Sequence, residues 1–226
     1  MELAIDTSTR FASIGLSSQG ESVVELTWRS ERNHSVELVP NIMRLFKRGR
    51  IGVKDLEAIY IATGPGGFSA LRVGMSAAKA MAVSLDVPLI AVGTLDIEAQ
   101  PYLGLGSPVC ALVGAGRRRL YIGDFREGAQ PVYRVIEHGE LATAAQADAL
   151  FCGEGVPQVT ELIRGAFGDD AKIANASLPT RHAGALGALG YMELQDGGIA
   201  DAFSLEPLYL RSSQVNTANR TWRGRG

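Results

Sequence analysis

An acidic residue and three hydroxyl residues stand together near the start of the chain, as Asp6, Thr7, Ser8 and Thr9. The apolar residues 3–5 before them are typical of a short strand, so this group should lie in a turn at a strand end. A carboxylate and hydroxyls in such a turn could hold the metal and phosphate end of a nucleotide. They could equally satisfy the backbone of a hairpin turn. These four residues are the candidate nucleotide-binding site.

A glycine-rich segment, Gly64 to Gly67, separates an apolar run from a stretch of small residues. A loop between a strand and a helix can bind an anion through its backbone N–H groups and the helix dipole. This loop lacks the lysine of a phosphate-binding P-loop. The small residues that follow would let another helix approach closely, either within the core of the protein or from a partner.

Side chains that bind metals do not occur at ligand spacing in this sequence. His34, His138 and His182 are scattered, and Cys110 and Cys152 lie in separate apolar runs without a CxxC pattern. The two cysteines are expected to be buried thiols in a reducing compartment. We predict no catalytic residue, no metal site and no cofactor.

The elements that must position these groups begin with a meander. Three strands are predicted over 3–5, 12–16 and 22–28. A helix, a strand, a helix and a strand are then predicted over 35–47, 58–62, 69–84 and 88–92. The order βββαβαβ predicts an α/β fold.

The composition changes near residues 100–108, where proline, glycine and serine cluster, and this indicates a lobe boundary. A second copy of the pattern follows, because an offset of 108 places Gly114 over Asp6 and Arg118 over Arg10. A strand and two helices are predicted over 132–136, 156–167 and 183–194. The predicted division is a first lobe over 1–100, rejoined by about 204–215, a second lobe over 101–203, and a polar, flexible tail over 216–226.

The overall composition is that of an ordinary folded protein, with 46% hydrophobic and 20% charged residues. The net charge of −2 gives no global electrostatic reason to bind nucleic acid. Neither a membrane-spanning run nor a secretory leader is evident, so a cytoplasmic protein without membrane contact is expected.

Three segments resemble the TsaB (YeaZ) family. They run from Ala4 to Thr9, from Gly64 to Gly74 and from Glu206 to Arg211, and Arg32-Asn33-His34-Ser35 before the first helix adds to the likeness. The resemblance covers nearly the whole chain. It implies the actin-like ASKHA fold, with two lobes of duplicated βββαβα units.

The resemblance also implies a function in tRNA modification. Proteins of this family bind the TsaD transferase and cooperate with the TsaE ATPase, so that TsaD can transfer a threonylcarbamoyl group to tRNA. Contact with tRNA would then be indirect, and a nucleotide could lodge at the TsaD interface. The family pairs with TsaD through first-lobe helices, and with a second copy of itself when TsaD is absent. On this basis the partner-binding residues are Val36, Val39, Met43, Phe46, Phe68, Ala70, Leu71, Gly74, Ala78 and Met81.

Two departures from the family and its superfamily argue against catalysis. Gly114 and Gly116 stand where family members often keep an Asp and an Arg, so the second lobe lacks the partner that a phosphate clamp would need. Thr94 and Glu98 stand where TsaD carries a His-x-x-x-His metal motif. We therefore expect a non-catalytic scaffold and favour the turn interpretation of Asp6.

Two alternatives stay open from the sequence. The first is an enzyme, either a small phosphotransferase or a metallopeptidase-like protein. The second is a tRNA-binding subunit that uses the tail arginines Arg220, Arg223 and Arg225.

Overall fold

The computed structural model describes residues 1–175 and 177–210, and the backbone of residues 216–217. The chain divides into two compact units. Unit 1 comprises Met1–Ile97 and Arg181–Leu208, and unit 2 comprises Glu98–Thr180 with the residues from Tyr209 onward. Within the described residues, no helix is both long and apolar enough to cross a membrane.

Unit 1 contains a five-stranded sheet in the order β3-β2-β1-β4-β5. Its strands are β1 (Glu2–Asp6), β2 (Phe11–Ser18), β3 (Glu21–Arg29), β4 (Ala58–Ala62) and β5 (Leu89–Val92). The first three form an antiparallel meander, and β4 and β5 run parallel to β1. All residues of β1 and β4 are buried, as expected for central strands that are covered on both faces.

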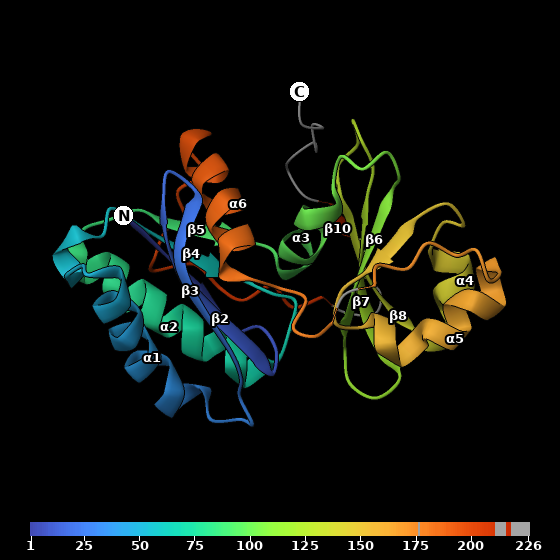
Figure 1. Ribbon diagram of the computed structural model, residues 1–226, viewed down its shortest axis with the longest axis horizontal. Helices are drawn as coiled ribbons and strands as arrows, with labels where there is room; N and C mark the ends of the chain where they lie inside the picture. Colours follow the sequence, from blue (N-terminus) through green and yellow to red (C-terminus); the bar gives the residue numbers. More distant parts are fainter. Residues whose placement is uncertain (176, 211–215, 218–226) are drawn as a thin grey trace. The chain divides into compact units, whose positions relative to one another are not determined.

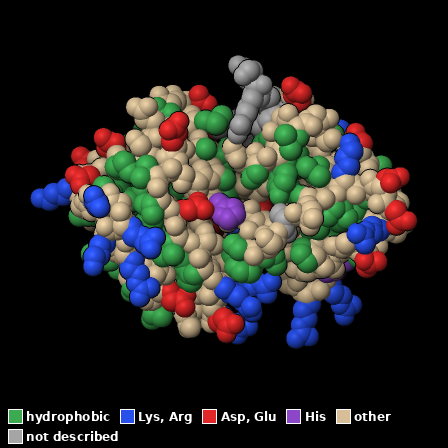
Figure 2. Space-filling model, viewed as in Figure 1, with side chains coloured by type: hydrophobic (Ala, Val, Ile, Leu, Met, Phe, Trp, Pro, Cys, Tyr) green, Lys and Arg blue, Asp and Glu red, His purple; other side chains and the backbone are tan. Residues whose placement is uncertain are grey.

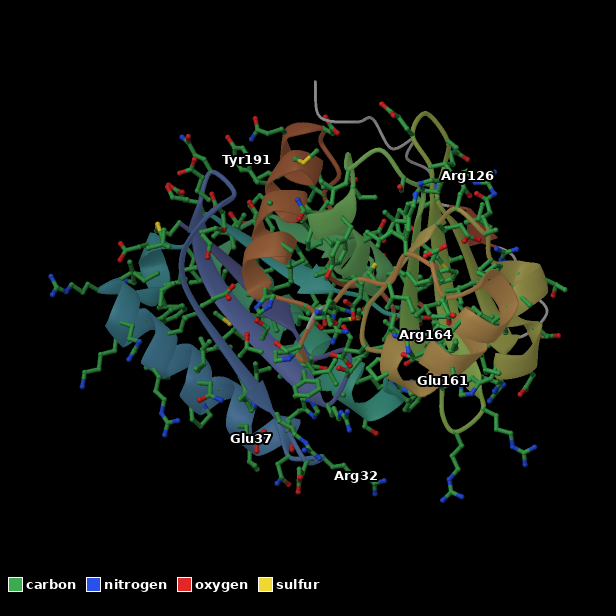
Figure 3. The ribbon with its side chains drawn as sticks, turned by 45° about the vertical axis from the view of Figure 1, so that its right-hand side comes forward. Arg32, Glu37, Arg126, Glu161, Arg164 and Tyr191 are labelled. Atoms are coloured by element: carbon green, nitrogen blue, oxygen red, sulfur yellow. The ribbon has the colours of Figure 1, made fainter. Side chains whose placement is uncertain are left out.

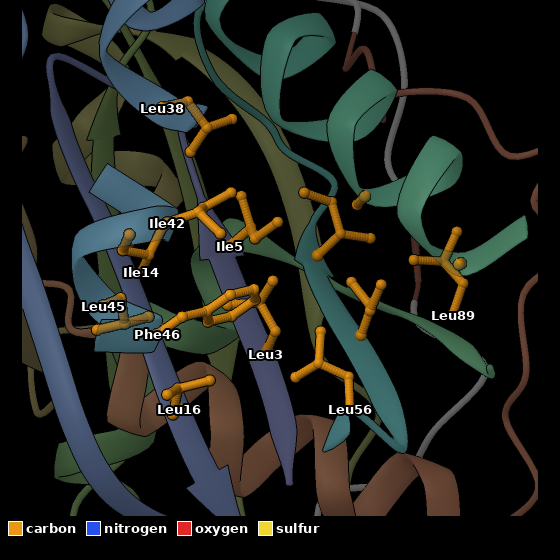
Figure 4. Close-up of a cluster of buried hydrophobic side chains, with 14 of the residues drawn as sticks. Leu3, Ile5, Ile14, Leu16, Leu38, Ile42, Leu45, Phe46, Leu56 and Leu89 are labelled. Carbon is orange, nitrogen blue, oxygen red and sulfur yellow. The ribbon is translucent and has the colours of Figure 1, made fainter. Parts of the chain in front are cut away.

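Helices cover both faces of this sheet (Figure 1). One face carries α1 (His34–Gly49) and α2 (Phe68–Leu85), and the other carries α6 (Ala183–Gln195). Leu3 and Ile5 point to the side of α1, where they meet Leu38, Ile42 and Phe46 (Figure 4). The alternate residue Ala4 packs in the cluster that contains residues of α6.

The position of α6 differs from the predicted division, which assigned residues 101–203 to the second lobe. In the structure, Arg181–Leu208 belongs to unit 1, and α6 packs on the first sheet. The physical reason is a stripe of small residues: a Cβ on Gly190 would clash with the ring of Tyr60, and one on Gly187 would lie 3.1 Å from Oγ of Ser17. These glycines let α6 lie close to β2 and β4.

Unit 2 contains a second five-stranded sheet in the order β10-β8-β7-β6-β9. Its strands are β6 (Val109–Gly114), β7 (Arg119–Phe125), β8 (Val132–Glu137), β9 (Leu150–Cys152) and β10 (Asn216–Thr217). The helices α4 (Leu141–Ala144) and α5 (Val156–Phe167) accompany it, and Val159 and Ile163 of α5 lie in its core. The strands β1 and β2, shifted by 108 positions, coincide with β6 and β7, as the sequence repeat predicts.

The remaining elements are short. They are α3 (Thr94–Ala99) and three turns of 3-10 helix, η1 (Val53–Asp55), η2 (Gln100–Tyr102) and η3 (His138–Glu140). The predicted tail over 216–226, with its arginines, lies outside the described residues except for the backbone of β10.

Candidate functional site

A buried ion pair lies at the end of β1 in unit 1. The Nε atom of Arg181 donates to Oδ2 of Asp6 at 2.8 Å, and the two side chains are 1% and 2% exposed. The other carboxylate oxygen, Oδ1, accepts from the backbone N–H of Ser8 at 2.8 Å and from the Ser8 hydroxyl. Both oxygens of Asp6 are therefore engaged within the protein.

The hydroxyl residues after Asp6 also bond inward. Oγ1 of Thr7 donates to the carbonyl of Ala70 at 2.7 Å, and Oγ1 of Thr9 accepts from Nη2 of Arg181 at 2.7 Å. Oγ1 of Thr94 donates to Oγ of Ser8 at 2.9 Å. These contacts tie the β1–β2 turn to α2, α3 and the segment before α6. They favour the turn interpretation of the four residues over phosphate binding.

Arg181 was not identified from the sequence as part of this group. It lies 175 positions from Asp6 and belongs to no periodic pattern. The sequence contains only an indirect signal for such a partner. A carboxylate at the end of a central strand needs a cation or several hydrogen-bond donors if it is to be buried.

The glycine-rich segment packs against the same turn. The backbone N–H of Gly67 donates to the carbonyl of Ser8 at 2.7 Å. A Cβ on Gly66 would clash with that carbonyl, and a Cβ on Gly74 would clash with Oγ1 of Thr7. These glycines therefore bring α2 close to the β1–β2 turn, which accounts for them without an anion.

The positions that correspond to a metal motif have structural partners. Oε1 of the buried Glu98 accepts from Oγ1 of Thr180 at 2.9 Å and from the backbone N–H of Glu154 at 3.1 Å. Nε2 of His34 lies 2.9 Å from the carbonyl oxygen of Thr9. Across the described ranges, no three His, Cys, Asp or Glu side chains gather as a metal site would require.

Both cysteines are free and buried, as the sequence predicts. Burial raises the pKa of the Cys110 and Cys152 thiols, because a low-dielectric environment disfavours the charged thiolate.

The predicted partner-binding residues divide into two groups. Val36, Val39 and Met43 are 68%, 57% and 62% exposed, and they follow one another at helical spacing on α1. Phe68, at the start of α2, is 55% exposed, and the guanidinium carbon of Arg72 lies 3.8 Å from its ring centroid. These four apolar side chains are hereafter the α1–α2 surface.

The other predicted residues do not form an accessible surface. The buried ones are Phe46, Leu71, Gly74 and Ala78. Ala70 and Met81 are half-buried. These four side chains are buried within unit 1, so the structure gives them no exposed surface for a partner, and their role in partner binding stays a prediction. Gly74 in particular is required by the close approach of Thr7.

Comparison with known proteins identifies the family. The family described as "TsaD: tRNA N6-adenosine threonylcarbamoyltransferase" matches residues 28–215. The chain is 29% identical to the tRNA threonylcarbamoyladenosine biosynthesis protein TsaB of Bacillus subtilis (strain 168), over 94% of this chain and 95% of that protein. It is 27% identical to the protein of the same name from Haemophilus influenzae, over 93% of each chain.

Solved structures agree. YeaZ from Pseudomonas aeruginosa matches with a TM-score of 0.77 and 26% identity, over 92% of this chain and 99% of that one. The two sheets with a repeated meander and this match confirm the predicted actin-like ASKHA fold. The chain therefore belongs to the family that the TsaD description defines, and within it to the TsaB (YeaZ) proteins.

Proposed function

We propose that this chain is a non-catalytic activating subunit in tRNA threonylcarbamoyladenosine biosynthesis, which binds a TsaD-type transferase in the cytoplasm and cooperates with a TsaE-type ATPase. The names of its relatives support the pathway. The inward bonding of Asp6 to Arg181 and Ser8 supports the lack of catalysis, because this carboxylate already has internal partners.

The observation that carries the proposal is the α1–α2 surface. Helix α1 has two apolar stripes: Leu38, Ile42 and Leu45 enter the core, while Val36, Val39 and Met43 point outward. A helix that only covers its own sheet needs one such stripe. The second stripe provides apolar area that a partner helix could bury, and a second copy of the chain would use it when the transferase is absent.

Size-exclusion chromatography with the transferase tests this surface. Val39→Glu places a charge in the exposed stripe and should abolish co-elution, since a charge buried without a partner opposes association. Leu162→Glu is the matched control, because Leu162 is an exposed apolar residue of helix α5 in unit 2. Loss of binding by both variants, or by neither, would contradict the assignment. A bulky residue at Gly74 is a poor probe because of the contact with Thr7.

An enzymatic function is the second candidate, and an assay of ATP hydrolysis by the purified chain tests it. Purified chain that hydrolyses ATP on its own, with loss of turnover in Asp6→Asn, would favour a phosphotransferase over a scaffold.

A further inference from the structure

Three consecutive exposed arginines lie where β6 passes into β7 in unit 2: Arg117 and Arg118 are in the turn, and Arg119 is the first residue of β7. In a chain with a net charge of −2, this is a strong local concentration of positive charge. Across the described residues, none of the three side chains has a carboxylate within ion-pair distance. The acidic residue in register with them is Glu137, opposite Arg119. We call Arg117 and Arg118 the arginine tip.

The backbone of this turn is held in place. The N–H of Ala115 donates to the carbonyl of Arg119 at 2.9 Å, and the N–H of His138 donates to the carbonyl of Arg118 at 2.8 Å. Gly116 has φ of +95° and no atom within 4 Å of the position a Cβ would take, so the turn opens to solvent. The tip therefore projects its charge from a fixed hairpin.

The corresponding turn of unit 1 has a structural role. There the β1–β2 turn bonds inward, and its charge is neutralised by Arg181. In unit 2, Gly114 replaces Asp6, so the equivalent turn has no carboxylate at that position. The arginines of the tip have no comparable internal partner, and the fold gives no reason for their side chains to be there.

We infer that the arginine tip binds the phosphate backbone of RNA. Guanidinium groups recognise phosphate oxygens by paired, charge-assisted hydrogen bonds, and adjacent arginines on a projecting turn can reach successive phosphates. This inference rests on the proposed function, which provides tRNA as the nucleic acid present. It differs from the alternative that uses the tail arginines, because the tip lies among the described residues of unit 2.

The control for this inference lies in the same unit. Arg126 follows the far end of β7, about 23 Å along the strand from Arg119 at roughly 3.3 Å per residue. Arg164 is on α5 and pairs with Glu161 at 3.7 Å. Figure 3 labels both arginines, and in Figure 2 Lys and Arg side chains project below the elements of unit 2. The tip variant is Arg117→Ala with Arg118→Ala, and the control variant is Arg126→Ala with Arg164→Ala. Each double variant removes two exposed positive charges.

The test measures binding of a labelled tRNA transcript by fluorescence anisotropy, with the full chain mixed with its TsaD-type transferase, from about 50 to 200 mM salt. The tip variant should bind several-fold more weakly and reduce the slope of log K against log salt by about two. The control variant should match the wild type. Unchanged binding in the tip variant, or an equal loss in both variants, would overturn the inference.

Co-elution with the transferase, measured on the same samples, separates the two proposals. A tip variant that still binds the transferase but loses tRNA affinity supports both. If the wild-type chain binds no transferase, the proposed function is contradicted. The role of the tip is then still decided by the tRNA affinities of the two double variants, measured without the transferase.

Discussion

The Nε atom of Arg181 lies 2.8 Å from Oδ2 of Asp6, so a positive charge just before α6 is buried against the end of β1. This pair joins the two sequence segments of unit 1, Met1–Ile97 and Arg181–Leu208. Both carboxylate oxygens of Asp6, a residue of the candidate nucleotide-binding site, are thus bonded within the protein.

The first prediction concerns the stability of this pair. Arg181→Ala leaves the Asp6 carboxylate buried without its cation and should lower the free energy of unfolding by about 3–5 kcal/mol. The double variant Asp6→Asn with Arg181→Met removes both charges and should lose less than Arg181→Ala. Urea denaturation followed by tryptophan fluorescence, to which Trp28 of unit 1 contributes, measures both. A change below about 0.5 kcal/mol in Arg181→Ala would show that the pair does not stabilise the fold.

The second prediction concerns the packing of α6. Gly190→Ala introduces a methyl group against the ring of Tyr60 and should destabilise the protein by about 1–3 kcal/mol. Gly165→Ala is the matched control, because Gly165 lies in helix α5 with no atom within 4 Å of its Cβ position. There the substitution should stabilise by about 0.4–1 kcal/mol. Thermal denaturation reports both, and equal effects would refute the close packing of α6 on β4.

The third prediction concerns the thiols. Because burial raises the pKa of Cys110 and Cys152, less thiolate forms at pH 8 in the folded protein than in an exposed cysteine. A thiol reagent should therefore react with neither cysteine on mixing with native protein, and with both after denaturation. The reaction of the native protein should accelerate as the pH rises, since thiolate is the reactive form. Rapid reaction of a native cysteine at pH 8 would contradict the burial.

The sequence was sufficient to predict β1 to β5, β8 and the repeat, but not β9 or β10. Apolar runs at residues 3–5 and 58–62 correspond to β1 and β4, and the offset of 108 aligned β6 and β7 correctly. These features depend on local patterns and on comparison of the chain with itself. Both are visible without a structure.

Three features of unit 1 could not be predicted because they depend on distant residues. The assignment of α6 to unit 1 depends on glycines that fit Ser17 and Tyr60, which no local pattern reveals. The choice between core and surface on α1 was ambiguous, since Phe46 and Met43 are both apolar and only the former faces the sheet. On α2 the small residues gave no amphipathic pattern that could orient the helix.

The most direct test of a non-catalytic activating role is reconstitution of tRNA threonylcarbamoylation from a TsaD-type transferase, a TsaE-type ATPase and this chain. We predict that modification requires the chain, that Leu162→Glu supports it as well as the wild type, and that Val39→Glu does not. Full modification of tRNA without this chain, or with Val39→Glu at the wild-type rate, would contradict the account.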